Sequence, residues 1–332
     1  MGWANASNGR RLVYYSLLAP PAPRADLSWQ FETSVATLRA HNPDIPVVLF
    51  LHGALPADVA TTCRRFRVMV HHQGAYAERL AALCPAGAAA LAAYPLLHKY
   101  LNFRELAASG VEQAMCCDLD TLFFGDVGVL FDRYGDADVV AREEVNCCRS
   151  HHGHDPSFID EELLGRLAGA ERRAPVPQFN LGFVLFNHFV VERLRELDRL
   201  FVDDAWRLVS WMAAHPVAGT ALAAYGEFVG LDRALATITA TDRQRALPFP
   251  STNRWILDEV ALWLALGAVP GLRTADFDRA DVAQNGEVLG VEAAAAPWIA
   301  CHYYTQNTHR IASWLQRWGE PAEYPSSRGE PR

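Results

Sequence analysis

The sequence contains no cluster of lysine and arginine residues. Its 332 residues carry a formal net charge of −8, and its pI is near 5.8. Surfaces that bind nucleic acid depend on clustered positive charge, so this composition argues against a nucleic acid as partner. A phosphate-containing ligand is still compatible with an acidic chain, because a metal ion can supply the positive charge.

The cysteines do not follow the pattern of a disulfide framework, and long apolar runs are absent. The seven cysteines are an odd number and include the adjacent pairs Cys116–Cys117 and Cys147–Cys148, which is typical of a reducing compartment. No apolar run approaches the roughly 18 residues that span a bilayer. The apolar segment 12–19 follows two arginines, as in a short signal sequence, but its residues favour a first strand. We therefore expect a cytoplasmic protein without a transmembrane segment.

Hydrophobic residues are abundant and make up 51% of the chain, against 20% charged residues. These values are typical of a globular protein rather than a disordered one, and the length suffices for a large core. We find no internal repeat and no linker. We therefore expect a single domain over 1–332, with a first half at about 11–144, an irregular region at 145–177 and a mostly helical second half at about 178–318.

Strand and helix patterns alternate from the start of the chain. Residues 11–18 and 45–51 are rich in strand-forming residues, and 27–41 between them has the apolar spacing of a helix. With a weaker strand at 66–70, this order predicts an α/β fold: a Rossmann-like mixed sheet, mainly parallel, flanked by helices and able to hold a nucleotide. Further along, the pattern predicts helices at 88–108, 127–134, 190–214, 219–239, 255–266 and 311–318, and strands at 138–142, 178–187 and 296–304.

Two carboxylates end an apolar run in the middle of the chain. The run 114–117 has the length of a buried strand, and Asp118 and Asp120 follow it. Carboxylates resist burial unless they are paired or bound to a metal, so they belong at the carboxyl end of the strand, where α/β sheets form their ligand crevice. Alternation directs both aspartates to one side and Leu119 to the other. Two hard oxygen ligands on one side suit Mn²⁺ or Mg²⁺ shared with a substrate phosphate.

Several segments together resemble nucleotide-sugar glycosyltransferases of the GT-A fold, nearest to the family 8 type that includes glycogenin and galactosyltransferases. The resemblance covers about residues 12–305. It rests on these segments: Val-Tyr-Tyr-Ser-Leu-Leu at 13–18, Val-Val-Leu-Phe-Leu at 47–51, Cys-Asp-Leu-Asp-Thr-Leu-Phe-Phe-Gly-Asp-Val at 117–127, Phe-Asn-Leu-Gly-Phe-Val-Leu-Phe-Asn at 179–187, Trp255-x-x-Asp-Glu259, and His302. It implies a GT-A-like fold and the metal-dependent transfer of a sugar, with retention, from a nucleotide-diphosphate sugar such as a UDP-sugar to an acceptor hydroxyl. The first half of the chain would bind the donor and the second half the acceptor.

The resemblance also implies residue roles. Asp118, Asp120 and His302 would hold Mn²⁺ or Mg²⁺ beside the donor diphosphate, and two carboxylates with an imidazole are a reasonable ligand set for Mn²⁺. The alternative for His302 is a core histidine packed beside Trp298 and Tyr303. The other residues implied on the donor side are Tyr15, Ser16, Lys99, Leu119, Arg142 and Gly182. The residues implied on the acceptor side and in catalysis are Asn180, Asp258 and Glu259, and Glu143 would face the same cleft.

Some of these residues also fit purely structural roles. Core packing explains Tyr15 nearly as well as contact with the nucleoside does, and Lys99 fits an exposed helix position equally well. The pair Asp258–Glu259 also fits the first turn of a helix, where the helix dipole favours negative charge.

The chain departs from the family pattern at two places. The family has a lysine six residues after the histidine, whereas this chain has Thr308, so that His309 or Arg310 would have to contact the leaving diphosphate instead. The family's Asp-Gln pair reads Asp258–Glu259, which provides a charged base and leaves the choice of retention to the resemblance alone.

The sequence leaves two alternative functions open, and one loop contains residues that could suggest a zinc site. Asp-Leu-Asp-Thr-Leu at 118–122 imitates the loop of haloacid-dehalogenase-type phosphatases, but the glycine of that loop is missing and the loop normally follows the first strand. An inactive protein that only binds a nucleotide sugar is the third alternative, and the missing lysine favours it. Five residues match no standard zinc spacing and favour a loop near the acceptor: Cys147, Cys148, His151, His152 and His154. The acceptor (small molecule, glycan or protein) and a homodimer are left open.

Overall fold

The computed structural model describes residues 11–20, 22, 24–143, 179–189, 192–214, 249–284, 287–291 and 296–317. For residues 192, 211–214, 249–256, 290 and 306 only the backbone is described. The predicted helix at 219–239, the irregular region 145–177 and the Cys147–His154 loop within it lie outside the described residues.

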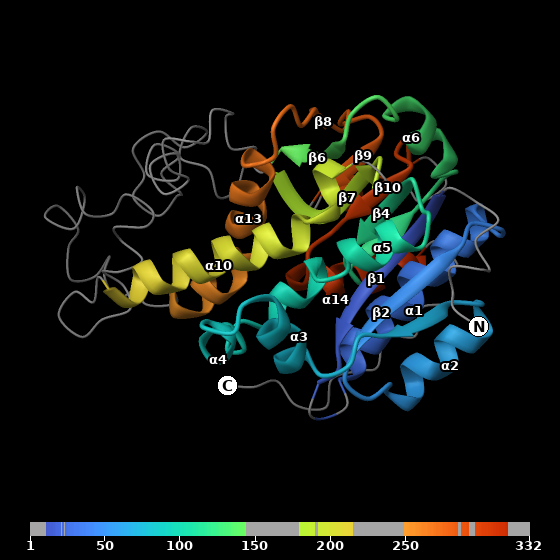
Figure 1. Cartoon of the computed structure of the whole chain (residues 1–332). Helices are drawn as coiled ribbons and strands as arrows, with labels where there is room; N and C mark the ends of the chain where they lie inside the picture. Colours follow the sequence, from blue (N-terminus) through green and yellow to red (C-terminus); the bar gives the residue numbers. More distant parts are fainter. Residues whose placement is uncertain are drawn as a thin grey trace, which may run out of the picture.

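A seven-stranded sheet forms the centre of the molecule (Figure 1). Its order is β3-β2-β1-β4-β7-β6-β8, and β7 alone runs antiparallel to both of its neighbours. The strands are β1 (Arg11–Leu18), β2 (Val47–His52), β3 (Met69–His72), β4 (Gln113–Cys117), β6 (Val139–Glu143), β7 (Phe179–Asn187) and β8 (Thr274–Asp276). The predicted α/β fold with a mainly parallel mixed sheet is confirmed.

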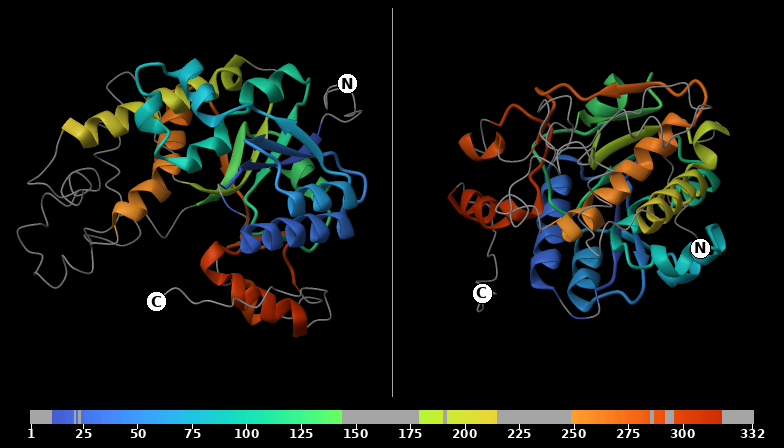
Figure 2. Two further views of the ribbon diagram at one scale, coloured as in Figure 1. Left: turned by 90° about the horizontal axis from the view of Figure 1, so that it is seen from below. Right: turned by 90° about the vertical axis from the view of Figure 1, so that its left-hand side faces the viewer.

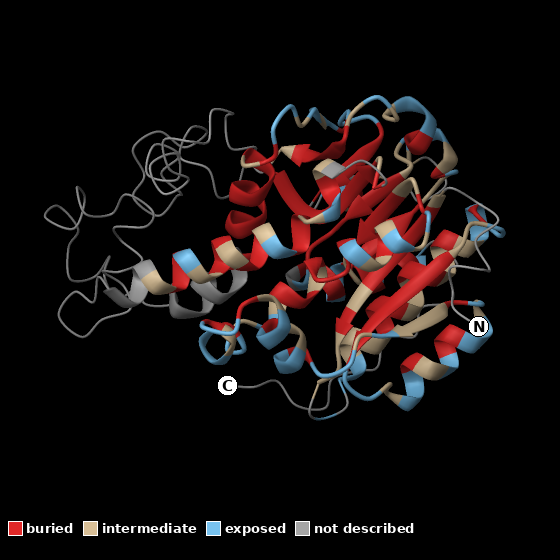
Figure 3. Ribbon diagram, in the orientation of Figure 1, coloured by how far each residue is buried: buried red, intermediate tan, exposed pale blue. Residues whose placement is uncertain are grey.

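Alternating side chains of the central strands feed two separate cores, one on each face of the sheet. On β1, Tyr14 faces one core and Tyr15 the other, and both are fully buried. The Tyr15 face is covered by α1 (Ala25–His41), α2 (Ala57–Arg65) and α6 (Gly128–Arg133). The Tyr14 face is covered by α3 (Tyr76–Leu83), α4 (Ala88–Leu91), α5 (Phe103–Ala108), α9 (Glu192–Arg195), α10 (Leu197–Ala214) and α13 (Phe249–Gly267). The inner strands β2, β1, β4, β7 and β6 are buried along most of their length (Figure 3), whereas the edge strands β3 and β8 are not.

A second, three-stranded sheet lies beside the main one and has the order β5-β10-β9. Its strands are β5 (Thr121–Phe123), β10 (Ala300–His302) and β9 (Val282–Gln284). The last helix, α14 (Thr308–Arg317), packs Trp314 and Ile311 into the core of this sheet and lies on the α1 side of the molecule (Figure 2). Because β10 pairs with β5 in this small sheet, His302 and Thr305 lie next to Asp120.

Three predicted helices differ from the structure, and the one expected at 190–214 is divided at Glu196 into α9 and α10. The helix expected at 88–108 is broken into α4, the 3₁₀ helix η2 (Pro95–Tyr100) and α5, because Pro95 keeps Tyr94 out of the helical region. The helix expected at 255–266 begins earlier, at Phe249. Asp258 and Glu259 therefore lie in its middle, and attraction to a helix N-terminus does not explain them.

Candidate metal and substrate site

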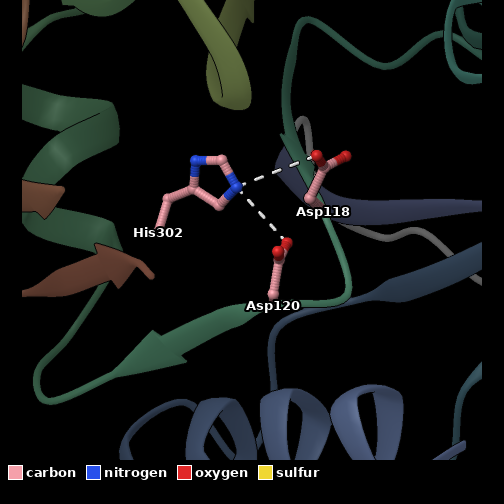
Figure 4. A group of neighbouring side chains, drawn as sticks. All are labelled: Asp118, Asp120 and His302. Carbon is pink, nitrogen blue, oxygen red and sulfur yellow. Dashed lines mark ion pairs between the residues drawn. The ribbon is translucent and has the colours of Figure 1, made fainter. Parts of the chain in front are cut away.

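Three side chains from separate parts of the sequence converge where the two sheets meet. Asp118 follows the last residue of β4, and Asp120 precedes the first residue of β5. His302 ends β10, which pairs antiparallel to β5 with His302 opposite Thr121. Figure 4 shows the imidazole directed at both carboxylates. The predicted metal triad is therefore assembled in space, which no single segment of the sequence could show.

The triad has the dimensions and chemistry of a divalent metal site. Nε2 of His302 lies 3.8 Å from Oδ2 of Asp118 and 3.3 Å from Oδ1 of Asp120, and one ligand atom from each of the three residues lies within 4.8 Å of the others. Burial disfavours charge on His302 and Asp120, but the attraction between the two groups raises the pKa of His302 and lowers the pKa of Asp120. Oxygen and imidazole ligands converging on one point fit Mn²⁺ or Mg²⁺.

Residues behind the triad hold its members in place. Thr305 donates a hydrogen bond from Oγ1 to Oδ2 of Asp120 at 2.9 Å. Asn180, on β7, lies 2.8 Å from Nδ1 of His302 through its Oδ1 atom. Gly182, also on β7, lies directly under the imidazole ring. The sequence placed Asn180 and Gly182 among the substrate-binding residues, whereas in the structure both also contact the third ligand of the triad.

Lys99 connects the triad to a second buried carboxylate. Its Nζ atom lies 2.8 Å from Oδ2 of Asp118 and 3.6 Å from Oδ2 of Asp258. Although burial disfavours the ammonium, Asp118 and Asp258 raise the pKa of Lys99. Lys99 is therefore protonated, and it is a largely buried cation of the site, with 16% of its side chain exposed.

Asp258 is a buried carboxylate whose oxygens have no hydrogen bond within the described part of the chain. Its side chain is 1% exposed, and neither carboxylate oxygen has a hydrogen-bond partner among the described residues. Burial raises the pKa of Asp258 to about 6, despite the opposing effect of Lys99 and together with the negative charge of Asp118. A buried carboxylate that lines a cavity in this condition can accept hydrogen bonds from a ligand hydroxyl.

A cavity of 420 Å³ joins these groups. Among the predicted site residues, those that line it are Ser16, Lys99, Asp118, Leu119, Asp120, Asn180, Gly182, Asp258, Glu259 and His302. The lining also includes the apolar residues Leu17, Leu18, Ala19, Pro20 and Leu27 and the cation Arg24. One cavity thus combines a metal triad, a cation, a buried carboxylate and an apolar wall, which is a suitable arrangement for a phosphate ester with an uncharged ring at its end.

Tyr15 and Arg142 do not line this cavity. Tyr15 is fully buried in the core and shares a hydrogen bond with Ser34, so core packing accounts for it. Arg142 donates a hydrogen bond to the carbonyl of Val282 and lies 3.8 Å from Glu287. Neighbouring elements enclose both side chains outside the cavity lining, and their contact with the donor stays a prediction. Glu143 does not line the cavity either.

The two residues expected to replace the missing lysine are exposed. His309 and Arg310 lie on the first turn of α14, outside the cavity lining, and Arg310 donates to Oδ1 of Asn307 at 3.4 Å. Thr308, at the position of the family's lysine, is buried and accepts a hydrogen bond from Gln30 at 2.8 Å. Among the described residues, neither Thr308 nor His309 nor Arg310 therefore lines the cavity.

Several cavity residues were missed by sequence analysis. Tyr304 and Thr305 lie two and three residues after His302, and His98 precedes Lys99, but nothing in their local pattern distinguishes them from core residues. Gln30 carries a detectable signal, because it is a polar residue within the apolar stripe of the helix at 27–41. A polar residue on the buried face of a helix has to find a partner, and that requirement could have drawn attention to Gln30.

Comparisons with known proteins yield similar structures but no sequence relatives. No protein-family model matches the chain, and no curated protein sequence matches it significantly. Mouse xyloside xylosyltransferase 1, in its apo form, aligns with a TM-score of 0.49 and 11% identity over 88% of this chain and 97% of its own. The galactosyltransferase LgtC, in complex with donor and acceptor sugar analogues, aligns with a TM-score of 0.46 and 11% identity over 92% of this chain and 95% of its own.

A third similar structure is the glycosyltransferase GlyE of Streptococcus pneumoniae, with a TM-score of 0.38 and 13% identity over 90% of this chain and 56% of its own. At these values the likeness by itself establishes neither the family nor the activity of this chain. Within the described residues, none of the helices has the length and apolar character needed to cross a membrane.

Proposed function

We propose that the chain is a metal-dependent glycosyltransferase that moves a sugar from a nucleotide-diphosphate sugar, a UDP-sugar in the first instance, to an acceptor hydroxyl with retention. The observation that carries this proposal is the convergence of Asp118, Asp120 and His302 in one cavity with Lys99 and the buried Asp258. Metal ligands next to a cation suit a diphosphate, and a buried acceptor of hydrogen bonds suits a sugar.

Each group has a role in this proposal. Asp118, Asp120 and His302 would hold Mn²⁺ or Mg²⁺, which when bound offsets the charge of a leaving diphosphate. Lys99, at 2.8 Å from Asp118, adds positive charge on the same side of the cavity. Asp258, 3.6 Å from Lys99, and Glu259 would orient sugar hydroxyls, and the apolar residues Leu17 and Leu27 would face the nucleobase.

The first test is metal-dependent binding. Asp120→Asn removes one ligand charge, and we expect its affinity for Mn²⁺ to fall by more than the roughly 10–100-fold that is typical of residues behind a ligand. The exposed Asp132→Asn is the matched control, because Asp132 lies on α6 and pairs with Arg11 instead. Calorimetry with Mn²⁺ and a panel of nucleotide-diphosphate sugars measures both affinities. If Asp120→Asn binds Mn²⁺ with the affinity of the wild type, the metal assignment is wrong.

Turnover assays then separate the remaining alternatives. Sugar transfer or slow hydrolysis of one nucleotide sugar under Mn²⁺ supports the proposal. Release of phosphate from a simple phosphoester, without any sugar nucleotide, would indicate a phosphatase instead. Tight binding of UDP under Mn²⁺ without transfer or hydrolysis would indicate a protein that only binds the nucleotide.

A further inference from the structure

The amide group of Asn180 has a fixed orientation. Asn180 is 2% exposed, and the backbone N–H of Gly182 points at its side-chain oxygen at 3.1 Å. A backbone N–H can only donate, so the atom that receives it has to be the carbonyl oxygen rather than the NH₂ group. The opposite end of the amide donates to the hydroxyl of Tyr304 at 2.9 Å. The Gly182 contact requires this orientation, and the Tyr304 contact is compatible with it because a hydroxyl can accept.

This orientation determines which nitrogen of His302 carries the proton. Nδ1 of His302 lies 2.8 Å from the same Asn180 oxygen, 122 residues away in the chain. A carbonyl oxygen can only accept, so Nδ1 has to be the protonated nitrogen. A neutral imidazole has one N–H, and Nε2 is therefore the nitrogen with the free lone pair. That nitrogen faces Asp118 and Asp120.

A local irregularity in the pairing of β6 and β7 lies beside Gly182. Ala141 of β6 pairs with Val184 of β7, but the next residue, Arg142, pairs with Asn180. Residues 181–183 therefore have no partner on β6. The Gly182 N–H bonds the Asn180 side chain, while its carbonyl accepts from the backbone N–H of Asp118 at 2.8 Å. Gly182 thus links the backbone of Asp118, one residue of the triad, to the side chain that contacts His302, another residue of the triad.

Gly182 also provides the space that the imidazole occupies. A Cβ atom at this position would lie 2.0 Å from Cε1 of His302 and 2.4 Å from each ring nitrogen. The imidazole also contacts the aromatic ring of Tyr304, and the centroids of the two rings are 4.5 Å apart. Tyr304 has a φ of +58° and a ψ of 137°, a conformation that costs energy for a residue other than glycine. Its bond to Asn180 helps to hold it there.

We infer that Asn180 is a positioning residue of the metal site. It holds His302 in the tautomer that is protonated at Nδ1, with Nε2 directed at Asp118 and Asp120, and Gly182 leaves the room for this arrangement. The inference rests on the proposed metal-dependent function. Its tautomer can nevertheless be measured without a metal, so that a failure of one is distinguishable from a failure of the other.

The first measurement is the tautomer itself. In the full chain labelled with ¹⁵N-histidine and stripped of metal with a chelator, long-range ¹H–¹⁵N spectra at alkaline pH distinguish Nδ1–H from Nε2–H. The His302→Gln spectrum identifies the resonance among the 12 histidines. We expect Nδ1–H in the wild type and in Asn180→Asp, whose carboxylate still accepts both N–H groups. We expect a shift toward Nε2–H in Asn180→Ala. Nε2–H in the wild type would overturn the inference, whether or not any variant folds.

The second measurement is the affinity for Mn²⁺ alone, by calorimetry without nucleotide. Loss of a hydrogen bond behind a ligand typically costs roughly 10–100-fold in metal affinity, and we expect this for Asn180→Ala, with partial rescue in Asn180→Asp. Gly182→Ala should also weaken binding, because its Cβ displaces the ring. The matched control is Asn187→Ala on the same strand, since Asn187 is equally buried but bonds the carbonyls of Tyr134 and Ala137.

The outcomes separate the two ideas. If the wild type binds Mn²⁺ and Asn180→Ala binds it equally well, the positioning role is wrong and the metal site stands. If the wild type does not bind Mn²⁺ but His302 is protonated at Nδ1 only when Asn180 is present, the tautomer assignment stands and the proposed function is wrong. A loss of affinity that Asn187→Ala reproduces would reduce the role of Asn180 to general stability and overturn the inference.

Discussion

Asp258→Asn should raise the free energy of unfolding relative to that of the wild type, and this gain should be larger at alkaline pH than at acidic pH. Asp258 is 1% exposed and its carboxylate has no hydrogen-bond partner among the described residues. Burial raises the pKa of Asp258 from its ordinary value of 3.8 to about 6. The folded state therefore holds this proton more tightly than the unfolded state does, and ionisation of Asp258 opposes folding.

The magnitude follows from the two pKa values. A difference of about two pH units corresponds to a cost on the order of 3 kcal/mol once Asp258 is ionised in both states. The cost is absent below about pH 4, where both states are protonated, and grows as the pH rises through about 6. Asparagine is neutral throughout and has nearly the same shape. The difference in free energy of unfolding between Asp258→Asn and the wild type should thus increase by about 3 kcal/mol, in favour of the variant, from about pH 4 to pH 8.

Urea unfolding with a chelator present, at several values of pH, measures this difference. Glu78→Gln is the control, because Glu78 is an exposed carboxylate on α3 and its substitution leaves the burial of charge unchanged. A difference between Asp258→Asn and the wild type that stays constant across the range would refute the reasoning. It would mean that water or a rearrangement already solvates Asp258.

Two further predictions concern neighbours of the site and of the core. Lys99→Gln removes the cation that lies 2.8 Å from Asp118 and 3.6 Å from Asp258. Breaking such a pair costs about 3–5 kcal/mol when it is buried, and the loss should be larger at pH 8 than at pH 5, where Asp258 is mostly protonated; an equal loss at both values would contradict the pairing with Asp258. Gly87→Ala places a Cβ 2.6 Å from Cδ2 of Trp206, although its φ of −104° suits alanine. Overpacking should lower the free energy of unfolding by about 1–3 kcal/mol, and an unchanged urea midpoint would show that Trp206 can move away.

Much of the fold could be predicted from the sequence because its signals are local. Continuous apolar runs predicted β1, β2, β4 and β7, since strands covered on both faces need apolar residues throughout. The shorter strands β5, β8 and β9 were missed, because three residues carry too little pattern. The helix at 88–108 was overextended, because its alanine and leucine content concealed the break at Pro95.

The site divides in the same way. The sequence by itself determined that Asp118 and Asp120 lie at the end of a buried strand, because carboxylates that directly follow an apolar run have to reach the edge of the sheet. Only the tertiary structure decided that His302 joins them, that Asn180 and Gly182 support its ring, and that Asp258 is buried beside Lys99. Those contacts join residues more than a hundred positions apart, and they depend on strand register and on the small sheet. Neither the strand register nor the small sheet can be predicted from a local pattern of residues.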